Sequence, residues 1–169
     1  MGKLVFGSRC AVLAVALSCA FLPSALAQAR IAELQAQFSR ESDPVRKAKV
    51  LPKLGDAQFN LVRREVDAGR YDQALKLIEE YRDAVKAAEA ALKASGLDAE
   101  RKPAGFKQLQ IHLRKSLREI EQILLALPAE QRPPFDALRQ DLEGIEKELL
   151  NLLFPRQPGK NPSQEKRKG

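Results

Sequence analysis

Apolar residues in this chain recur at alternating intervals of three and four, and this spacing limits the folds that are open to it. The segment 70–94 has the clearest example, with Tyr71, Ala74, Ile78, Tyr81, Val85, Ala88 and Leu92. Such a heptad seam forms one apolar stripe along a helix, where a neighbouring helix packs. Similar stripes run through 103–127 and 134–153, and no segment alternates apolar and polar residues as a half-buried strand does. The chain is therefore predicted to be all-α.

Proline and glycine residues mark where the predicted helices begin and end. Asp43 can cap a helix that has Pro44 in its first position, and Gly69 stops that helix. The predicted helices are 29–40, 44–68, 70–94, 103–127 and 134–153. Because the connections between these long helices are short, helices that follow one another in the sequence are expected to pack antiparallel. The prediction is an antiparallel bundle of two long helical hairpins plus a short N-terminal helix, with coiled-coil-like packing.

Two further details concern the first hairpin. Pro52 lies inside the predicted helix 44–68 and is expected to kink or split it near 48–51, because proline removes a backbone hydrogen bond. A second stripe of small residues lies beside the seam of 70–94, formed by Ala84, Ala87, Ala91 and Ala94. Because alanine lets a second helix approach closely, the helix 70–94 is predicted to be central in the bundle.

The first 27 residues match an export signal. Lys3 and Arg9 precede an apolar run, Cys10–Leu22, that is interrupted only by Ser18. Small residues follow at the positions that a signal peptidase reads, within 25–27. The run is shorter than the roughly 20 apolar residues of a membrane-spanning helix. A signal peptide over 1–27 is therefore predicted, with a helical domain over 28–154 that is periplasmic or extracellular.

The alternative processing is lipidation. The segment 16–19 loosely resembles a lipobox, although Leu17 is bulky where a small residue is usual, and a lipid on Cys19 would anchor the chain to a membrane. Cys10 and Cys19 are the only cysteines. A mature chain that begins at Gln28 has no disulfide, so its core alone must hold it together.

Much of the formal net charge of +7 lies in a C-terminal tail over 155–169. This tail has five basic residues against Glu165 and no apolar residue to bury. Its composition predicts disorder. The tail is interpreted as a solubilising end, and the alternative is a weak contact with anionic lipid or envelope polymer. An exported chain whose charge lies in its appendages is not expected to bind nucleic acid.

No catalytic, cofactor-binding or metal-binding residues are predicted. His112 is the only histidine, lies away from the main stripe of 103–127, and is interpreted as a solvated or lightly buried structural residue. One histidine without cysteine cannot form a zinc site of the usual kind. The only methionine is Met1, so a methionine–histidine haem site is not expected in the mature chain. The chain is predicted not to be an enzyme and to need no cofactor.

One cluster of basic residues lies on 103–127, formed by Lys107, Arg114, Lys115 and Arg118. It could bind an anion. The segment 134–153, however, is rich in acidic residues, with Asp136, Asp141, Glu143, Glu146 and Glu148. The preferred interpretation is a charge-matched hairpin between these two helices.

Three resemblances are present. The segment 68–81, AGRYDQALKLIEEY, resembles the start of the second helix of a tetratricopeptide repeat, but a shift by 34 residues puts Pro103 where a second Gly69 should be. The segment 127–138, LPAEQRPPFDAL, is similar to a helix-start motif of periplasmic chaperones of the CpxP and Spy type, where the motif occurs twice. The helical body resembles a family of uncharacterised exported bacterial helical proteins, which brings no known activity with it.

These observations predict a non-enzymatic extracytoplasmic helical protein that acts as an interaction module or scaffold with a protein partner. The alternatives are a periplasmic chaperone-like binder of unfolded clients and a protein that binds the envelope or membrane surface. A chaperone of the first kind should have a concave, basic and partly apolar face. A scaffold should have a localised apolar patch.

Overall fold

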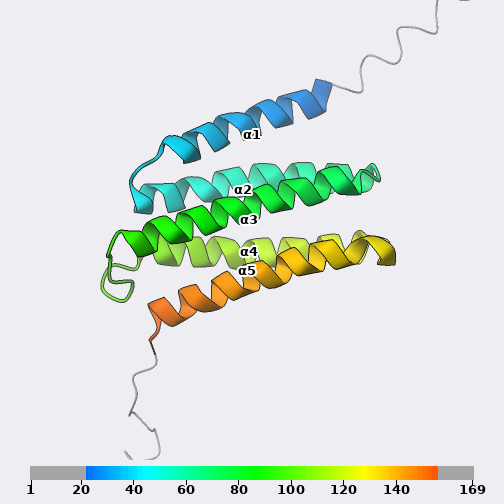
Figure 1. Cartoon of the computed structure of the whole chain (residues 1–169). Helices are drawn as coiled ribbons and strands as arrows, with labels where there is room; N and C mark the ends of the chain where they lie inside the picture. The colour runs from blue at the N-terminus through cyan, green and yellow to red at the C-terminus, as the bar shows by residue number, and fades with distance from the viewer. Residues whose placement is uncertain (1–21, 156–169) are drawn as a thin grey trace, which may run out of the picture.

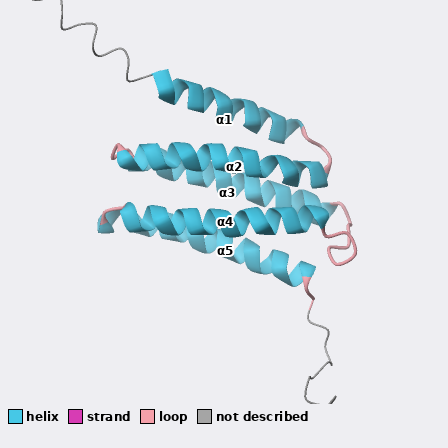
Figure 2. Ribbon diagram, turned by 180° about the vertical axis from the view of Figure 1, so that it is seen from behind, coloured by secondary structure: helices cyan, strands magenta, loops and turns pink. Residues whose placement is uncertain are grey.

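A computed structural model of the protein describes residues 22–155, which form five α-helices and one short 3₁₀ turn (Figure 1). The elements are α1 (Leu22–Arg40), α2 (Pro44–Asp67), α3 (Tyr71–Ala94), α4 (Ala104–Ala126), η1 (Ala129–Gln131) and α5 (Arg132–Leu153). Within this range there is no strand (Figure 2). The all-α prediction is confirmed, whereas most of the predicted signal peptide and nearly all of the tail lie outside the described residues.

Consecutive helices run antiparallel and form two hairpins, α2 with α3 and α4 with α5 (Figure 1). The hairpins stack so that α2 packs on α4 and α3 packs on α5, and α1 packs along α2. This is the predicted bundle. The N-terminal helix is longer than predicted, since it begins at Leu22 and not near Ala29. Ala27 packs against the core, so cleavage before Gln28 would shorten α1 from its N-terminal end.

The turns follow the signals in the sequence. The Asp43 carboxylate accepts a hydrogen bond from the backbone N–H of Arg46 at 2.7 Å, and Pro44 is the first residue of α2. Gly69 and Gly96 have φ angles of 71° and 67°, in the left-handed region that favours glycine. These residues end α2 and α3 and set up the reversals of the chain.

The expected split of α2 at Pro52 does not occur, because α2 is continuous from Pro44 to Asp67. Proline in this position cannot donate a hydrogen bond to the carbonyl of Ala48. The side chains of Leu51 and Leu54, on either side of Pro52, are fully buried. Their packing offsets the lost hydrogen bond, and the helix continues past Pro52.

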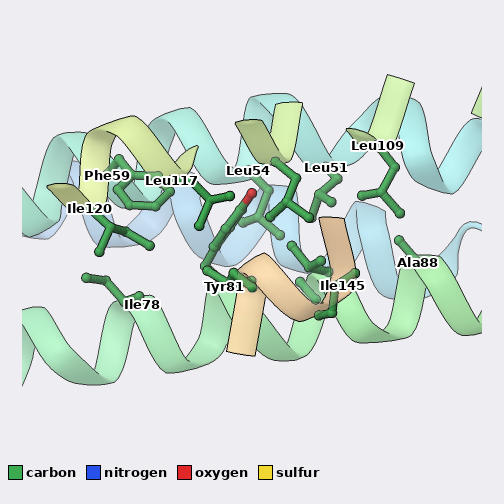
Figure 3. Packing of buried hydrophobic residues seen from close by; sticks show 14 of the residues in the cluster. Leu51, Leu54, Phe59, Ile78, Tyr81, Ala88, Leu109, Leu117, Ile120 and Ile145 are labelled. Atoms are coloured by element: carbon green, nitrogen blue, oxygen red, sulfur yellow. The ribbon is translucent and has the colours of Figure 1, made fainter. Parts of the chain in front are cut away.

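The predicted seams form the core (Figure 3). Along α3 every seam position from Ala74 to Leu92 is buried, and only Tyr71 at the start is half-buried. The apolar spacing of 134–153 predicts a stripe of Phe135, Leu138, Leu142, Ile145, Leu149 and Leu152. It is buried through Leu149, but Leu152 is 38% exposed and Leu153 is buried in its place. The end of α5 has therefore turned away from the strict heptad repeat.

The helix α3 is central, since it packs on α2, α4 and α5, but its alanine stripe is only partly covered. Ala84 is buried, Ala91 is half-buried, and Ala87 and Ala94 are exposed. The helix that could have covered this stripe is α1, but α1 packs along α2 instead. One side of α3 is therefore open between residues 84 and 94.

Within residues 22–155, none of the helices combines the length and the apolar character that crossing a bilayer requires.

Candidate functional site

A groove of about 1310 Å³ lies between α1 and α3. The two helices pack on the same neighbour, α2, which supplies Leu61 and Glu65 to the groove. We call this hollow the α1–α3 groove. It exists because α1 packs along α2 and makes few contacts with α3, so that part of the α3 surface has no helix over it.

The α1 side of the groove is apolar at depth and uncharged at the rim. Ile31 and Phe38 are buried and reach the groove lining, and Gln28 and Gln35 supply amide groups. Lys47 of α2 places its ammonium group 5.1 Å from the centre of the Phe38 ring, which is a cation–π distance. This side therefore offers apolar contact and hydrogen bonds without a net acidic or basic character.

The α3 side combines small and charged residues. Ala84 and Ala87 line the groove, together with Leu77. Lys76 and Glu80, which lie one turn apart, are exposed, and neither forms an ion pair within residues 22–155. The charged pair is therefore available to a ligand.

The buried charge of the groove is neutralised inside the protein. Glu65 is only 6% exposed, and its carboxylate accepts a hydrogen bond from the guanidinium Nε of Arg70. This bond raises the pKa of Arg70, since it favours the charged guanidinium. Over the whole lining, acidic and basic side chains balance: Lys47, Arg70 and Lys76 against Glu65, Glu80 and Asp83.

The predicted charge matching of the second hairpin holds only in part. Arg114 of α4 pairs with Glu146 of α5 at 3.1 Å. Lys115 instead pairs with Asp56 of α2 at 2.7 Å. Acidic residues of α5 pair with α3, since Asp141 lies 3.6 Å from both Arg82 and Lys86, and Glu148 lies 2.5 Å from Lys93. The bundle gives each of these helices more than one neighbour, so its charges are shared among them.

The remaining members of the basic cluster, Lys107 and Arg118, are exposed and form no ion pair with any described residue. Neither of them, nor Arg114 or Lys115, lines the α1–α3 groove. The structure thus separates the basic cluster from the concave surface.

His112 is not solvated or lightly buried as interpreted from the sequence, because only 4% of it is exposed. The Tyr81 hydroxyl donates a hydrogen bond to Ser116 Oγ at 2.8 Å, and Ser116 Oγ donates to the carbonyl of His112 at 3.1 Å. The Tyr81 and His112 rings meet edge to face, with centroids 5.8 Å apart. Gly55 of α2 lies against both rings. These residues form a packed junction of α2, α3 and α4.

The environment of this junction favours neutral rings. Burial lowers the pKa of His112 to about 4, with a small opposing effect of Asp56 and a small lowering effect of Lys115. Burial also raises the pKa of Tyr81, although its bond to Ser116 opposes the rise. His112 lines neither the α1–α3 groove nor the smaller pocket at the end of α1, and its ring contacts are with Tyr81 and Gly55.

We expect His112 to make the bundle sensitive to mild acid. Between pH 6.5 and about 4 the unfolded chain binds a proton at His112 and the folded chain does not, so the free energy of unfolding falls as pH falls, by roughly 1 kcal/mol per pH unit. Urea unfolding at pH 5, 6 and 7 measures this slope. The variant His112→Leu, which cannot titrate, should lose most of it.

Asp136 and Glu148 do not confuse this test. Hydrogen bonds from Arg139 and Lys93, respectively, lower the pKa of these carboxyl groups in the folded chain, and any slope that they add near pH 5 is also present in His112→Leu. Equal slopes in the wild-type protein and in His112→Leu would show that His112 is accessible to protons in the folded state.

No metal or cofactor can be assigned to the described residues. Among residues 22–155 there is no group of three or more histidine, cysteine, aspartate or glutamate side chains placed to hold a metal ion. The absence of enzymatic activity and of cofactors stays a prediction.

The α1–α3 groove was not predicted from the sequence. The stripe Leu77, Glu80, Ala84 and Ala87 was a signal that could have indicated it.

Comparison of the chain with protein-family models, with curated proteins and with solved structures gave no match.

Proposed function

We propose that this chain is a non-enzymatic, exported interaction protein that binds a polypeptide in the α1–α3 groove. The observation that carries the proposal is the groove itself, with a volume of about 1310 Å³ and an apolar base formed by Ile31, Phe38 and Leu61. Export is part of the proposal because of the signal-like segment 1–27.

The size of the groove favours a polypeptide over a small molecule. Pockets for small ligands measure roughly 300–1,000 Å³ and enclose most of the ligand. The α1–α3 groove is larger than this range, and it lies between two helices. Its apolar centre and polar rim also match the anatomy of protein interfaces. A polypeptide segment can fill such a groove, whereas a small molecule would leave much of it wet.

The distribution of charge favours a dedicated partner over general binding of unfolded clients. A chaperone of the CpxP and Spy type would present its basic residues on the concave face. Here the groove has balanced charges, and the basic cluster lies on α4 outside it. Binding in the groove therefore depends on shape and on placed polar groups, which is typical of recognition of one partner.

Site-specific photo-crosslinking in the native host tests this proposal. A photoreactive amino acid replaces Ala32 or Ala87, both exposed and in the groove lining, in the full chain. Ala29 is the matched control, since it is exposed on the same helix as Ala32 but is not part of the lining. We expect a discrete polypeptide adduct from positions 32 and 87 and none from position 29.

Two results would contradict this proposal. If positions 32 and 87 give no adduct, or if all three positions give the same adducts, the groove is not a polypeptide-binding site.

A further inference from the structure

We propose that the occupant of the α1–α3 groove is a single amphipathic α-helix of the partner, and not an extended segment. This inference rests on the proposed function, because it names the form of the polypeptide that the groove binds.

The first argument is the spacing of the residues that line the groove. On α1 the lining includes Gln28, Ala32, Gln35 and Ser39, at intervals of four, three and four. On α3 it includes Leu77, Glu80, Ala84 and Ala87, at intervals of three, four and three. This is the heptad spacing with which a helix meets another helix. The two sides of the groove thus repeat the pattern that holds the core together.

The second argument is the size of the side chains. Ala32 and Ala87 are small, and Ala84 is small and buried, so an incoming helix can approach each side closely, at the roughly 8–10 Å between axes that packed helices adopt. Apart from Leu77 on α3, the large apolar groups of the lining lie at the base of the groove, where they are buried. The occupant must therefore bring its own large apolar residues, in a stripe that faces α2.

The third argument is backbone hydrogen bonding. Both sides of the groove are helices, whose backbone N–H and C=O groups bond within the helix. An extended segment in this groove would bury its own backbone groups without backbone partners, and buried polar groups of this kind are costly. A helix satisfies these groups internally. The groove therefore suits a helix far better than a strand.

The fourth argument is charge complementarity. Lys76 and Glu80 are one turn apart on the α3 rim and have no ion-pair partner within residues 22–155. A helix lying along α3 meets them best with one acidic and one basic residue at the same spacing.

The length of the groove sets the length of the partner helix. The lining runs from position 28 to 39 on α1 and from 73 to 87 on α3, which corresponds to about 16–21 Å of helix. The partner helix thus needs about four turns.

Synthetic peptides provide the test. The helical probe is a peptide of about 18 residues with leucines at heptad spacing and glutamate–lysine pairs at i and i+4. A second probe has the same pairs in reverse order. A third probe is the first peptide with two central residues replaced by proline. Fluorescence anisotropy measures the binding of each labelled probe to the full chain and to its variants.

We expect the helical probes to bind and the proline-containing probe to bind at least about tenfold more weakly. Ala32→Trp, which fills the groove, should weaken binding by a similar factor, and Ala29→Trp should leave it unchanged. The double variant Lys76→Glu, Glu80→Lys should reverse the preference between the two charge orders. Circular dichroism of each variant checks that the bundle remains folded.

The outcomes separate this inference from the proposed function. If the proline-containing probe binds as well as the helical probes and Ala32→Trp blocks it, the groove binds extended polypeptides and the helix inference is wrong while the proposed function stands. If no helical probe binds, or if Ala29→Trp weakens binding as much as Ala32→Trp, the helix inference is overturned. Crosslinking from positions 32 and 87 then decides independently whether any polypeptide occupies the groove.

Discussion

Replacement of Ile145 by aspartate should unfold most of the bundle under conditions in which the wild-type protein is folded. Ile145 is 7% exposed and belongs to the core that α5 forms with α3 and α4, where it lies among the buried side chains of Figure 3. Loss of a buried branched side chain costs about 2–5 kcal/mol. A carboxylate in its place must also lose its hydration or force the packing open. The whole fold has roughly 5–15 kcal/mol of stability.

Thermal melts followed by circular dichroism measure this effect. Lys147→Asp is the matched control, because Lys147 lies on the same helix, is exposed and forms no ion pair among the described residues. It introduces the same side chain without burial. Similar small shifts of the melting temperature in both variants would mean that the α5 seam faces solvent and that the arrangement of α5 is wrong.

Replacement of Gly55 by alanine should destabilise the bundle although alanine favours helices. A Cβ at this position would lie 2.5 Å from His112 Nε2 and 2.8 Å from Tyr81 Cε2. Both rings are buried and held by their neighbours, so they cannot move aside easily. We expect a loss of about 3 kcal/mol, at the upper end of the usual cost of overpacking and larger than the roughly 1 kcal/mol that alanine contributes to a helix.

Gly144→Ala is the control for this substitution. Gly144 is also inside a helix, but it is exposed and a Cβ there would meet no atom within 4 Å. This variant should gain about 0.5–1 kcal/mol of stability from helix propensity alone. Urea unfolding of the two variants should therefore shift in opposite directions. A gain in both would show that α2 and α4 are farther apart at Gly55 than described.

The sequence by itself was enough to predict the helices and their pairing. The seam from Ala74 to Leu92 is buried as predicted, and the turn at Gly69 has the backbone angle that its residue type suggests. These features are local, or they repeat along one helix. Their signal therefore adds up over many residues, and short connections leave antiparallel hairpins as the simplest arrangement.

Other features depended on tertiary packing. Pro52 was expected to kink or split α2, and the split does not occur, because fully buried leucines on both sides keep the helix continuous. His112 was expected near the surface, yet the close approach of Gly55 buries its ring. In both cases the outcome depends on a neighbouring helix, whose distance and rotation cannot be read from the local pattern.

The α1–α3 groove is the clearest feature that only the tertiary structure decided. The alanine stripe of α3 can be read from the sequence. Its spacing is the same whether a helix covers it or not, so the sequence does not show that it is open. Whether α1 packs on α2 or on α3 depends on small differences between competing apolar faces. In this protein Ile31, Leu34 and Phe38 are buried on the side of α1 that packs along α2, so Ala87 and the end of the stripe stay open. Periodicity determined which residues form helix faces, and the competition between those faces for neighbours determined which face was left open.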